Sequence, residues 1–294
     1  MEHQGKTPWY LHVLFWLIAC STILPILLVF MVSITDETTI TRNGYSFIPE
    51  KISFEAYKYL FLDSMTIVRA YGVTIFITIV GSVVGLLLSA LLAYPLSRRD
   101  FPYRNKLAFF VFFTMLFNGG LVPWYLVFTQ LINLKDTIWS LIIPGLLING
   151  FYILIMRTFF STSIPPALIE SAYIDGAGEF RIFFQIVLRL STPVLATIGL
   201  FYTLAYWNDW FNSLVFLTDS KLYSLQYLLN KILLNIQFLA QNTRNNNASQ
   251  IIATLPTETV RMAMAIIGVG PIVLAYPFFQ KYFVKGLTVG AVKG

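Results

Sequence analysis

Charged residues are scarce in this chain of 294 residues. Asp, Glu, Lys and Arg make up 12% of it, whereas hydrophobic residues make up 57%. A soluble globular domain carries about 25% charged residues, so the composition excludes an ordinary soluble fold. The mean hydropathy of +0.71 agrees with this exclusion. We therefore expect a membrane protein.

Cysteine and histidine are also nearly absent. Cys20 is the one cysteine and lies in an apolar run, and the two histidines, His3 and His12, are both close to the N-terminus. This set provides neither a disulfide framework nor the usual ligands of a zinc site. The sequence shows no Gly-rich phosphate-binding loop and no converging nucleophile and base. We expect no metal centre, no cofactor bound by this chain and no enzyme activity of its own.

Long apolar stretches are abundant. A helix that spans a bilayer needs about 20 predominantly apolar residues, and six such stretches lie near residues 9–34, 67–96, 107–129, 137–160, 190–217 and 259–280. Lipid offers no partner to backbone polar groups, so each stretch is expected to be a helix. The prediction is an all-α polytopic membrane protein with six transmembrane helices. Residues 1–294 would form one transmembrane domain, with a core over about 67–280.

The Lys and Arg residues in the connecting segments predict the orientation. With the N-terminus inside, the inner segments hold 11 of them and the outer segments 7. A basic bias marks the cytoplasmic side, so both termini are expected in the cytoplasm. Basic loops beside anionic lipid account for the net charge of +6 without a nucleic-acid partner. This orientation places segments 161–188 and 281–294 in the cytoplasm.

Segment 161–188 has the pattern of a short helix, a sharp turn and a second helix. Ser163 can cap the first helix, Pro165 or Pro166 fits its first turn, and Gly176 can end it in the left-handed conformation. One small, partly apolar face would consist of Ala167, Leu168, Ser171 and Ala172. Such a face suits docking into a groove on another protein. The alternative is a solvated or membrane-surface connection between spans.

The same segment resembles a known family. Glu170 to Gly176 read Glu-Ser-Ala-Tyr-Ile-Asp-Gly, and Ile186-Val187-Leu188 follow after nine residues. This pattern is similar to the Glu-Ala-Ala loop of membrane subunits in binding-protein-dependent ABC importers. Within that class the chain resembles maltose-type carbohydrate permeases, specifically the second of their two membrane subunits. Further matching segments are Gly120 to Tyr125, Arg157 to Phe160, Ile164-Pro165, Ile174 to Ala177, Trp207 to Asp209, Gly286 to Thr288 and Val292 to Gly294.

The resemblance implies a coupling helix that seats in a cleft of a cytoplasmic ATPase. The implied coupling residues are Ala167, Leu168, Glu170, Ser171, Ala172, Asp175 and Gly176. The tail, 281–294, would reach between the ATPase subunits, or would simply be a frayed end. One departure from the family pattern is Arg189, which stands where proline is usual, so the second helix of the loop need not break there. Arg189 would face lipid phosphates or an acidic partner residue, and Pro193 is the next place for a kink.

The resemblance also implies an assembly. This chain would pair with a second, homologous permease subunit as a heterodimer, on a dimeric ATPase that holds ATP and Mg. An extracytoplasmic solute-binding protein would deliver a sugar or oligosaccharide. The complex would sit among the lipids of a bacterial cytoplasmic (inner) membrane, where the chain would work by alternating access.

A polar and aromatic stripe in the fifth stretch is the candidate substrate pathway. Sugars pack on aromatic rings and offer hydroxyls to amides and carboxylates. The expected pathway residues are Tyr202, Tyr206, Asn208 and Asp209, with Asn149 from the fourth stretch. The alternative is that the aromatic side chains form an interfacial belt while Asn and Asp bond neighbouring helices. By the resemblance, most substrate contacts would lie in the partner permease.

The opposing function classes are a self-sufficient channel or secondary transporter, and a membrane-embedded enzyme, for which no converging nucleophile, base or metal ligands appear in the sequence. A secondary transporter would need intramembrane charges for ion coupling, yet apart from Asp209 the charges lie at the ends of the stretches. A channel or secondary transporter that is not coupled to an ATPase is the alternative function. The cargo also stays open between neutral sugars and acidic glycan fragments.

Overall fold

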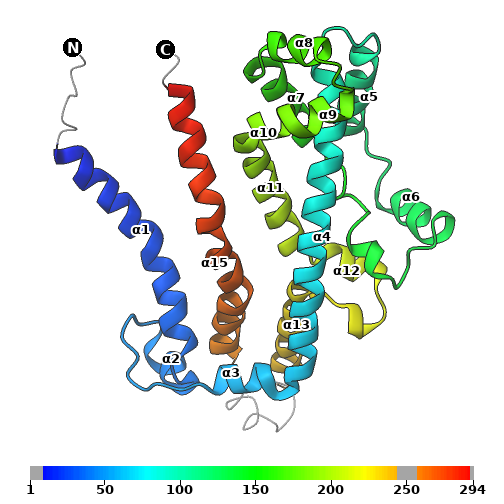
Figure 1. Ribbon diagram of the computed structural model, residues 1–294. Helices are drawn as coiled ribbons and strands as arrows, with labels where there is room; N and C mark the ends of the chain where they lie inside the picture. Colours follow the sequence, from blue (N-terminus) through cyan, green and yellow to red (C-terminus); the bar gives the residue numbers. More distant parts are fainter. Residues whose placement is uncertain (1–8, 244–256, 292–294) are drawn as a thin grey trace. The chain divides into compact units, whose positions relative to one another are not determined.

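The computed structural model describes residues 9–243 and 257–291 (Figure 1). No strand occurs among these residues, and their only β-type pairing is an isolated bridge between Thr35 and Ile52. The helices are α1 (Trp9–Ser33), α2 (Glu37–Asn43), α3 (Glu55–Leu60), α4 (Ser64–Ser97), α5 (Arg104–Leu116), α6 (Leu121–Leu126), α7 (Gly150–Ser163), α8 (Pro166–Ile174), α9 (Glu179–Ile182), α10 (Leu188–Leu190), α11 (Thr192–Trp207), α12 (Phe211–Phe216), α13 (Leu225–Thr243) and α15 (Thr257–Ala291). Shorter turns are η1 (Phe61–Asp63), η3 (Ile138–Leu141) and η5 (Ser220–Leu222), which are 3-10 helical, and η2 (Val127–Leu131) and η4 (Phe183–Val187), which are π-helical. The all-α prediction is confirmed for the described residues.

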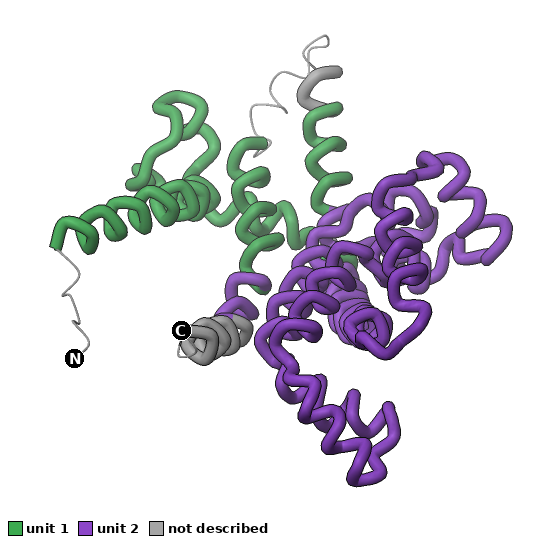
Figure 2. Tube along the Cα trace, turned by 90° about the horizontal axis from the view of Figure 1, so that it is seen from above, with its two compact units in different colours: residues 1–67, 229–271 green, residues 68–228, 272–294 purple. Residues whose placement is uncertain are grey.

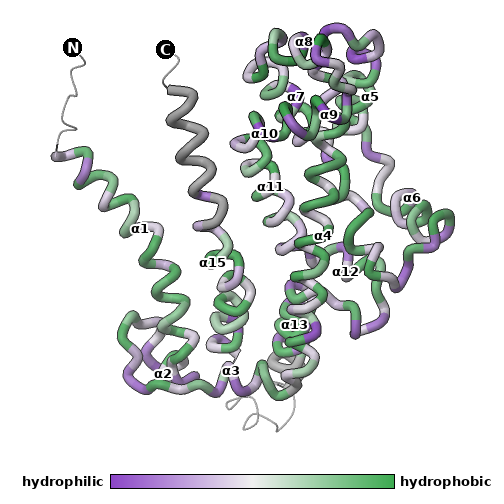
Figure 3. Tube along the Cα trace, in the orientation of Figure 1, coloured by the Kyte–Doolittle hydropathy of each residue, from purple (hydrophilic) through white to green (hydrophobic). Residues whose placement is uncertain are grey.

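Three helices of the described chain are long and apolar enough to cross a membrane. They are α1, α4 and the Thr257–Pro277 part of α15, and Figure 3 shows apolar residues along much of α1 and α4. Three pairs of shorter helices meet the same test together but are bent at a break: α5 with α6 and η2, α7 with α8, and the α9 to α10 run with α11. The described residues thus hold three spanning helices, or up to six if each bent pair counts as one span. This pattern agrees with a multi-pass membrane protein.

Three of the predicted stretches are not single continuous helices. In 107–129, α5 ends at Leu116 and the next helix begins at Leu121, with a bend of 114° between the two. Gly120, directly before the second helix, has a φ of +85°, a value that side chains with a Cβ rarely adopt. The prediction of one continuous helix over residues 107–129 is therefore wrong.

The other two breaks arise from side chains that cap helices. Asn149 Oδ1 accepts the backbone N–H of Phe151 at 3.0 Å, so α7 begins only at Gly150 and not at residue 137. In the fifth stretch, α11 ends at Trp207, and Asp209 Oδ1 accepts the N–H of Phe211 at 3.1 Å where α12 begins. Both caps are Asn or Asp residues, which compete with a continuous helix by bonding nearby backbone groups.

The chain divides into two compact units, which Figure 2 colours separately. The first contains residues 1–67 and 229–271, and the second contains residues 68–228 and 272–294. In the first unit the carboxylate of Glu37 accepts the N–H groups of Glu258 and Thr259, each at 2.9 Å. Glu37 thus satisfies the unpaired N–H groups at the start of α15. One transmembrane domain over 1–294 stays a prediction.

The second unit contains the core that positions the candidate site. Its buried apolar cluster takes side chains from α4, α7, α8, α9, η4 and α11: Ala90, Ala93, Tyr94, Leu96, Ile153, Met156, Phe160, Ile164, Ala172, Ile182, Phe183, Val187, Val194, Ile198, Tyr202 and Tyr206. Gly85 of α4 lets a ring from α11 approach the backbone closely, since a Cβ there would lie 2.9 Å from Tyr202 Cε1. Gly81, four residues earlier on the same helix, faces the ring of Tyr206 even more closely. The absence of side chains at these two positions allows α4 and α11 to pack.

Candidate functional site

Helix α8 is the short helix that the sequence predicts for segment 161–188. Pro166 is its first residue, where a missing N–H costs nothing. The predicted cap by Ser163 does not form, because Ser163 is the last residue of α7 and Pro165 occupies the cap position. Gly176 has a φ of +76° and donates its N–H to the Tyr173 carbonyl at 2.9 Å. With the bond from Ala177 N to Ala172 O, also 2.9 Å, this is a Schellman turn, so the predicted glycine stop is confirmed.

The predicted coupling residues lie on two sides of α8. Those exposed are Ala167, Leu168, Glu170, Ser171, Asp175 and Gly176. Ala172 is only 7% exposed and packs into the core of the second unit. The face available to a partner therefore consists of the exposed residues. Ala172, through its packing against the core, holds the helix in place. Docking of this face to an ATPase stays a prediction.

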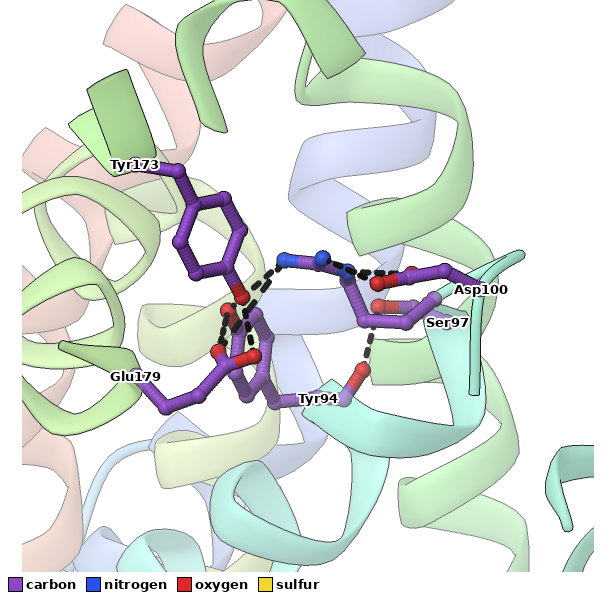
Figure 4. Close-up of polar contacts among 6 residues, drawn as sticks. Tyr94, Ser97, Asp100, Tyr173 and Glu179 are labelled. Atoms are coloured by element: carbon purple, nitrogen blue, oxygen red, sulfur yellow. Dashed lines mark hydrogen bonds and ion pairs between the residues drawn. The ribbon is translucent and has the colours of Figure 1, made fainter. Parts of the chain in front are cut away.

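A charged cluster fastens this loop to the end of α4 (Figure 4). Arg98 follows the last residue of α4, and its guanidinium donates to both carboxylate oxygens of Asp100, at 2.8 and 2.6 Å. A third bond runs from Arg98 Nη1 to Tyr94 Oη at 3.1 Å, and the guanidinium carbon lies 5.4 Å from the centroid of the Tyr173 ring. The Arg98 side chain is 13% exposed, whereas those of Asp100 and Glu179 are 66% and 56% exposed. The arginine is thus the inner member of the cluster.

Glu179 joins three parts of the chain at this cluster. Its Oε2 accepts the hydroxyl of Tyr94 at 2.7 Å and lies 4.0 Å from Arg98 Nη1. Its other oxygen, Oε1, accepts the hydroxyl of Tyr173. Figure 4 shows both phenol groups directed at this carboxylate, Tyr94 from α4 and Tyr173 from α8. Since Glu179 is itself the first residue of α9, the end of α4, α8 and α9 meet at one carboxylate.

The charges of Arg98 and Asp100 stay fixed near neutral pH. Hydrogen bonding from Arg98 lowers the pKa of the Asp100 carboxyl, and the bond to Asp100 raises the pKa of the Arg98 guanidinium. Each charged form is thus stabilised by its partner. Both shifts move the titrations further from pH 7, so this contact needs no change of protonation.

Two more features lie at the same end of α4. Arg157 of α7 donates from Nε to the carbonyl of Leu96 at 3.1 Å and so satisfies one of the last carbonyls of α4. A cavity of 340 Å³ is lined by Leu91, Tyr94, Pro95, Arg98, Asp100, Phe101, Pro102, Glu179, Phe180 and Phe183. Helices on both sides of the coupling loop are therefore held to this one helix end.

The roles of Arg98, Arg157, Tyr173 and Glu179 could not be predicted from the sequence. The two arginines entered the prediction only as charges that set the orientation, although Arg157 lies in a matched motif. Tyr173 is part of the Glu170 to Gly176 motif itself, which was the one available signal. No sequence signal indicated that Arg98 would contact Tyr173 and Glu179, because these residues are far from Arg98 in the chain.

The helix that contains Arg189 does not break at that residue. It continues to Leu190, and the chain turns at Ser191 by 84° into α11, in which Pro193 is the second residue. The break therefore lies at Ser191, and Pro193 does not kink the helix but stands in the first turn of α11. Arg189 is exposed, and its predicted contact with lipid or an acidic partner residue stays a prediction.

The two predicted pathway tyrosines are fully buried in α11. Tyr202 Oη and Ser89 Oγ are hydrogen-bonded at 2.7 Å, and Tyr206 Oη donates to the Ile142 carbonyl at 2.8 Å. These bonds join α11 to α4 and to the segment before α7. The contacts favour the helix-packing alternative for this chain taken by itself.

The other predicted pathway residues form mainly local bonds. Asn149 caps α7, and Asn208 Nδ2 donates to the Leu204 carbonyl of its own helix at 2.9 Å. Asp209 Oδ1 accepts the backbone N–H groups of Phe211 and Asn212, but its Oδ2 is buried without a hydrogen-bond partner among the described residues. The pathway role of the set stays a prediction.

An all-helical membrane protein with bent apolar helix pairs and one short exposed helix is typical of transport permeases. Residues 85–289 match the family of the binding-protein-dependent transport system inner membrane component, and the chain belongs to this family. It is therefore a transport permease component and a multi-pass protein of the inner membrane, and not an enzyme. The resemblance found in the sequence is confirmed at this level.

Individual relatives cover nearly the whole chain. Protein LplC of Bacillus subtilis is 40% identical over 273 residues, which are 93% of this chain and 90% of that protein. The polygalacturonan/rhamnogalacturonan transport system permease protein YtcP of the same species is 40% identical over 272 residues, covering 92% and 93%. Among solved structures, a bacterial ABC transporter involved in the import of the acidic polysaccharide alginate is similar, with a TM-score of 0.78 and 31% identity over 92% of this chain and 94% of that chain.

Proposed function

We propose that this chain is one membrane subunit of an ATP-driven, binding-protein-dependent importer of sugars or oligosaccharides. The observation that carries the proposal is α8, a short exposed helix that follows α7 at a bend of 77° and ends in a Schellman turn at Gly176. A helix rigidly joined to the helices on either side can move them as one body. An ATPase that grips α8 could therefore shift the spans between inward-open and outward-open states.

The proposed assembly follows from the family. This chain pairs with a second, homologous permease as a heterodimer, on two ATPase subunits that bind ATP and Mg. A solute-binding protein docks on the opposite side of the membrane. Both termini and segment 161–188 are cytoplasmic, and the chain crosses the membrane six times; the Lys and Arg distribution supports this orientation.

We propose an oligosaccharide of an acidic glycan as the cargo to test first. Support comes from the names of relatives: YtcP is named for polygalacturonan and rhamnogalacturonan, and the similar solved transporter for alginate. Both names refer to glycans with uronate sugars. Neutral oligosaccharides are the competing cargo class.

Isolation of a tagged chain from native membranes tests the proposal. An ATPase and a second permease are expected to copurify, and the reconstituted complex with its binding protein should import oligogalacturonate or oligoalginate when ATP is supplied. Import of neutral maltooligosaccharides alone would replace the acidic cargo. A chain that transports alone, without ATP, would instead establish the channel or secondary-transporter alternative.

A further inference from the structure

The end of α4 carries more contacts than the neutralisation of Arg98 requires. A nearly buried arginine is costly unless it is paired, and the fork of bonds to Asp100 already pairs it. The guanidinium nevertheless also bonds Tyr94, lies 4.0 Å from Glu179 and faces the ring of Tyr173. These additional contacts join α4 to α8 and α9.

The contacts are also arranged so that they leave the outer face of α8 exposed. Ala172 packs into the core of the second unit and Tyr173 bonds Glu179, while Leu168 is 43% exposed on the outer face. The helix is thus held on one side and open on the other. A force applied to the open face would reach α4 through the Tyr173, Glu179 and Arg98 contacts.

We infer that Arg98 and Glu179 are positioning residues that hold α8 against the end of α4, so that a movement of α8 is transmitted to this spanning helix. The inference rests on the proposed coupling of α8 to an ATPase. Loss of the contact lets α8 tilt while α4 stays in place. The ATPase then still binds and hydrolyses ATP, but less substrate is moved for each ATP consumed.

The first test replaces Arg98 in the complete complex, reconstituted in proteoliposomes with its binding protein and cargo. Arg98→Ala is expected to lower the amount of sugar imported per ATP hydrolysed by about fivefold or more, the lower end of typical coupling between two sites. Arg98→Lys keeps the charge but not the planar fork, so its loss should be smaller. Arg99→Ala, which removes the same charge at the next, exposed residue, is the matched control and should keep the wild-type ratio.

A second variant removes the hydroxyl that links α8 to Glu179. Tyr173→Phe deletes one hydroxyl and keeps the ring, so it is expected to fold even if Arg98→Ala does not. It should lower the import-to-ATP ratio and speed amide hydrogen exchange in residues 167–174. The control is Tyr103→Phe, at a tyrosine that is 58% exposed.

Three outcomes separate this inference from the proposed function. If the wild-type complex couples ATP to import and both Arg98→Ala and Tyr173→Phe keep the wild-type ratio, the positioning role is wrong and the importer proposal stands. A variant that loses import and ATP hydrolysis in equal proportion, with normal assembly, also overturns the role, since positioning predicts an unequal loss. If the wild-type chain recruits no ATPase, the proposed function itself fails.

Discussion

Replacing Gly176 by alanine tests whether the turn that ends α8 must keep its shape. Gly176 has a φ of +76°, and a Cβ added there would meet nothing within 4 Å. The substitution therefore adds no clash and changes only the cost of the backbone conformation. For a residue with a Cβ, the left-handed conformation costs about 1–2 kcal/mol, which is a factor of about 5–30 in an equilibrium constant.

The assay is the recruitment of the ATPase by the tagged permease, titrated to an apparent affinity, together with uptake in proteoliposomes. We expect Gly176→Ala to weaken both by about 5–30-fold if the Schellman turn sets the angle of α8. Asparagine visits the left-handed region more readily than alanine, and β-branched valine does so least. Recruitment should therefore fall in the order Gly, Asn, Ala, Val.

Gly178 provides the matched control. It lies two residues later, has a φ of −74°, and also has open space where a Cβ would be. Gly178→Ala is thus expected to stay within about twofold of wild type, as surface substitutions usually do. Full uptake and full ATPase recruitment by Gly176→Val would refute the reasoning.

Three further predictions concern the second unit. Gly81→Ala drives a methyl into the Tyr206 ring and should lower the free energy of unfolding of the purified chain by about 1–3 kcal/mol, measured by thermal unfolding. The control is Gly72→Ala, which has open space and should not lower it; equal stabilities of the two variants would contradict the packing. Tyr206→Phe leaves a buried carbonyl unpaired and should lower stability by about 1–3 kcal/mol without changing the apparent KM for sugar; a raised KM would favour the pathway role. Hydrogen bonds from Thr218 lower the pKa of Asp136 below 3.8, so their stabilisation is present above that pH and is lost as pH falls toward the lowered value. Between pH 5 and about 3, the melting temperature of the wild type should therefore fall further than that of Asp136→Asn. Equal decreases would show that these hydrogen bonds do not contribute to stability.

Several features of the site could be predicted because their causes are local. The position of α8 follows from Pro166 at its start and Gly176 at its end, and these residues act through the conformations that their own backbones allow. The long apolar runs of α1 and α4 are equally local signals, since each one alone meets the length that a bilayer requires. The same local view failed at Asn149 and Asp209, where a side-chain cap starts a new helix inside an apolar run.

By itself the sequence determined the membrane class, the family and the position of the coupling motif, because composition, span length and turn residues act over short distances. Only the tertiary structure decided what each face of that motif contacts. Tyr94 and Glu179, which are bonded through a hydroxyl and a carboxylate, are 85 residues apart in the chain. The hydroxyl of Tyr206 bonds the carbonyl of a residue 64 positions away. Such pairings arise from the packing of helices against one another. Hydrophobic periodicity predicts where a helix forms, but it does not predict which other helix it packs against.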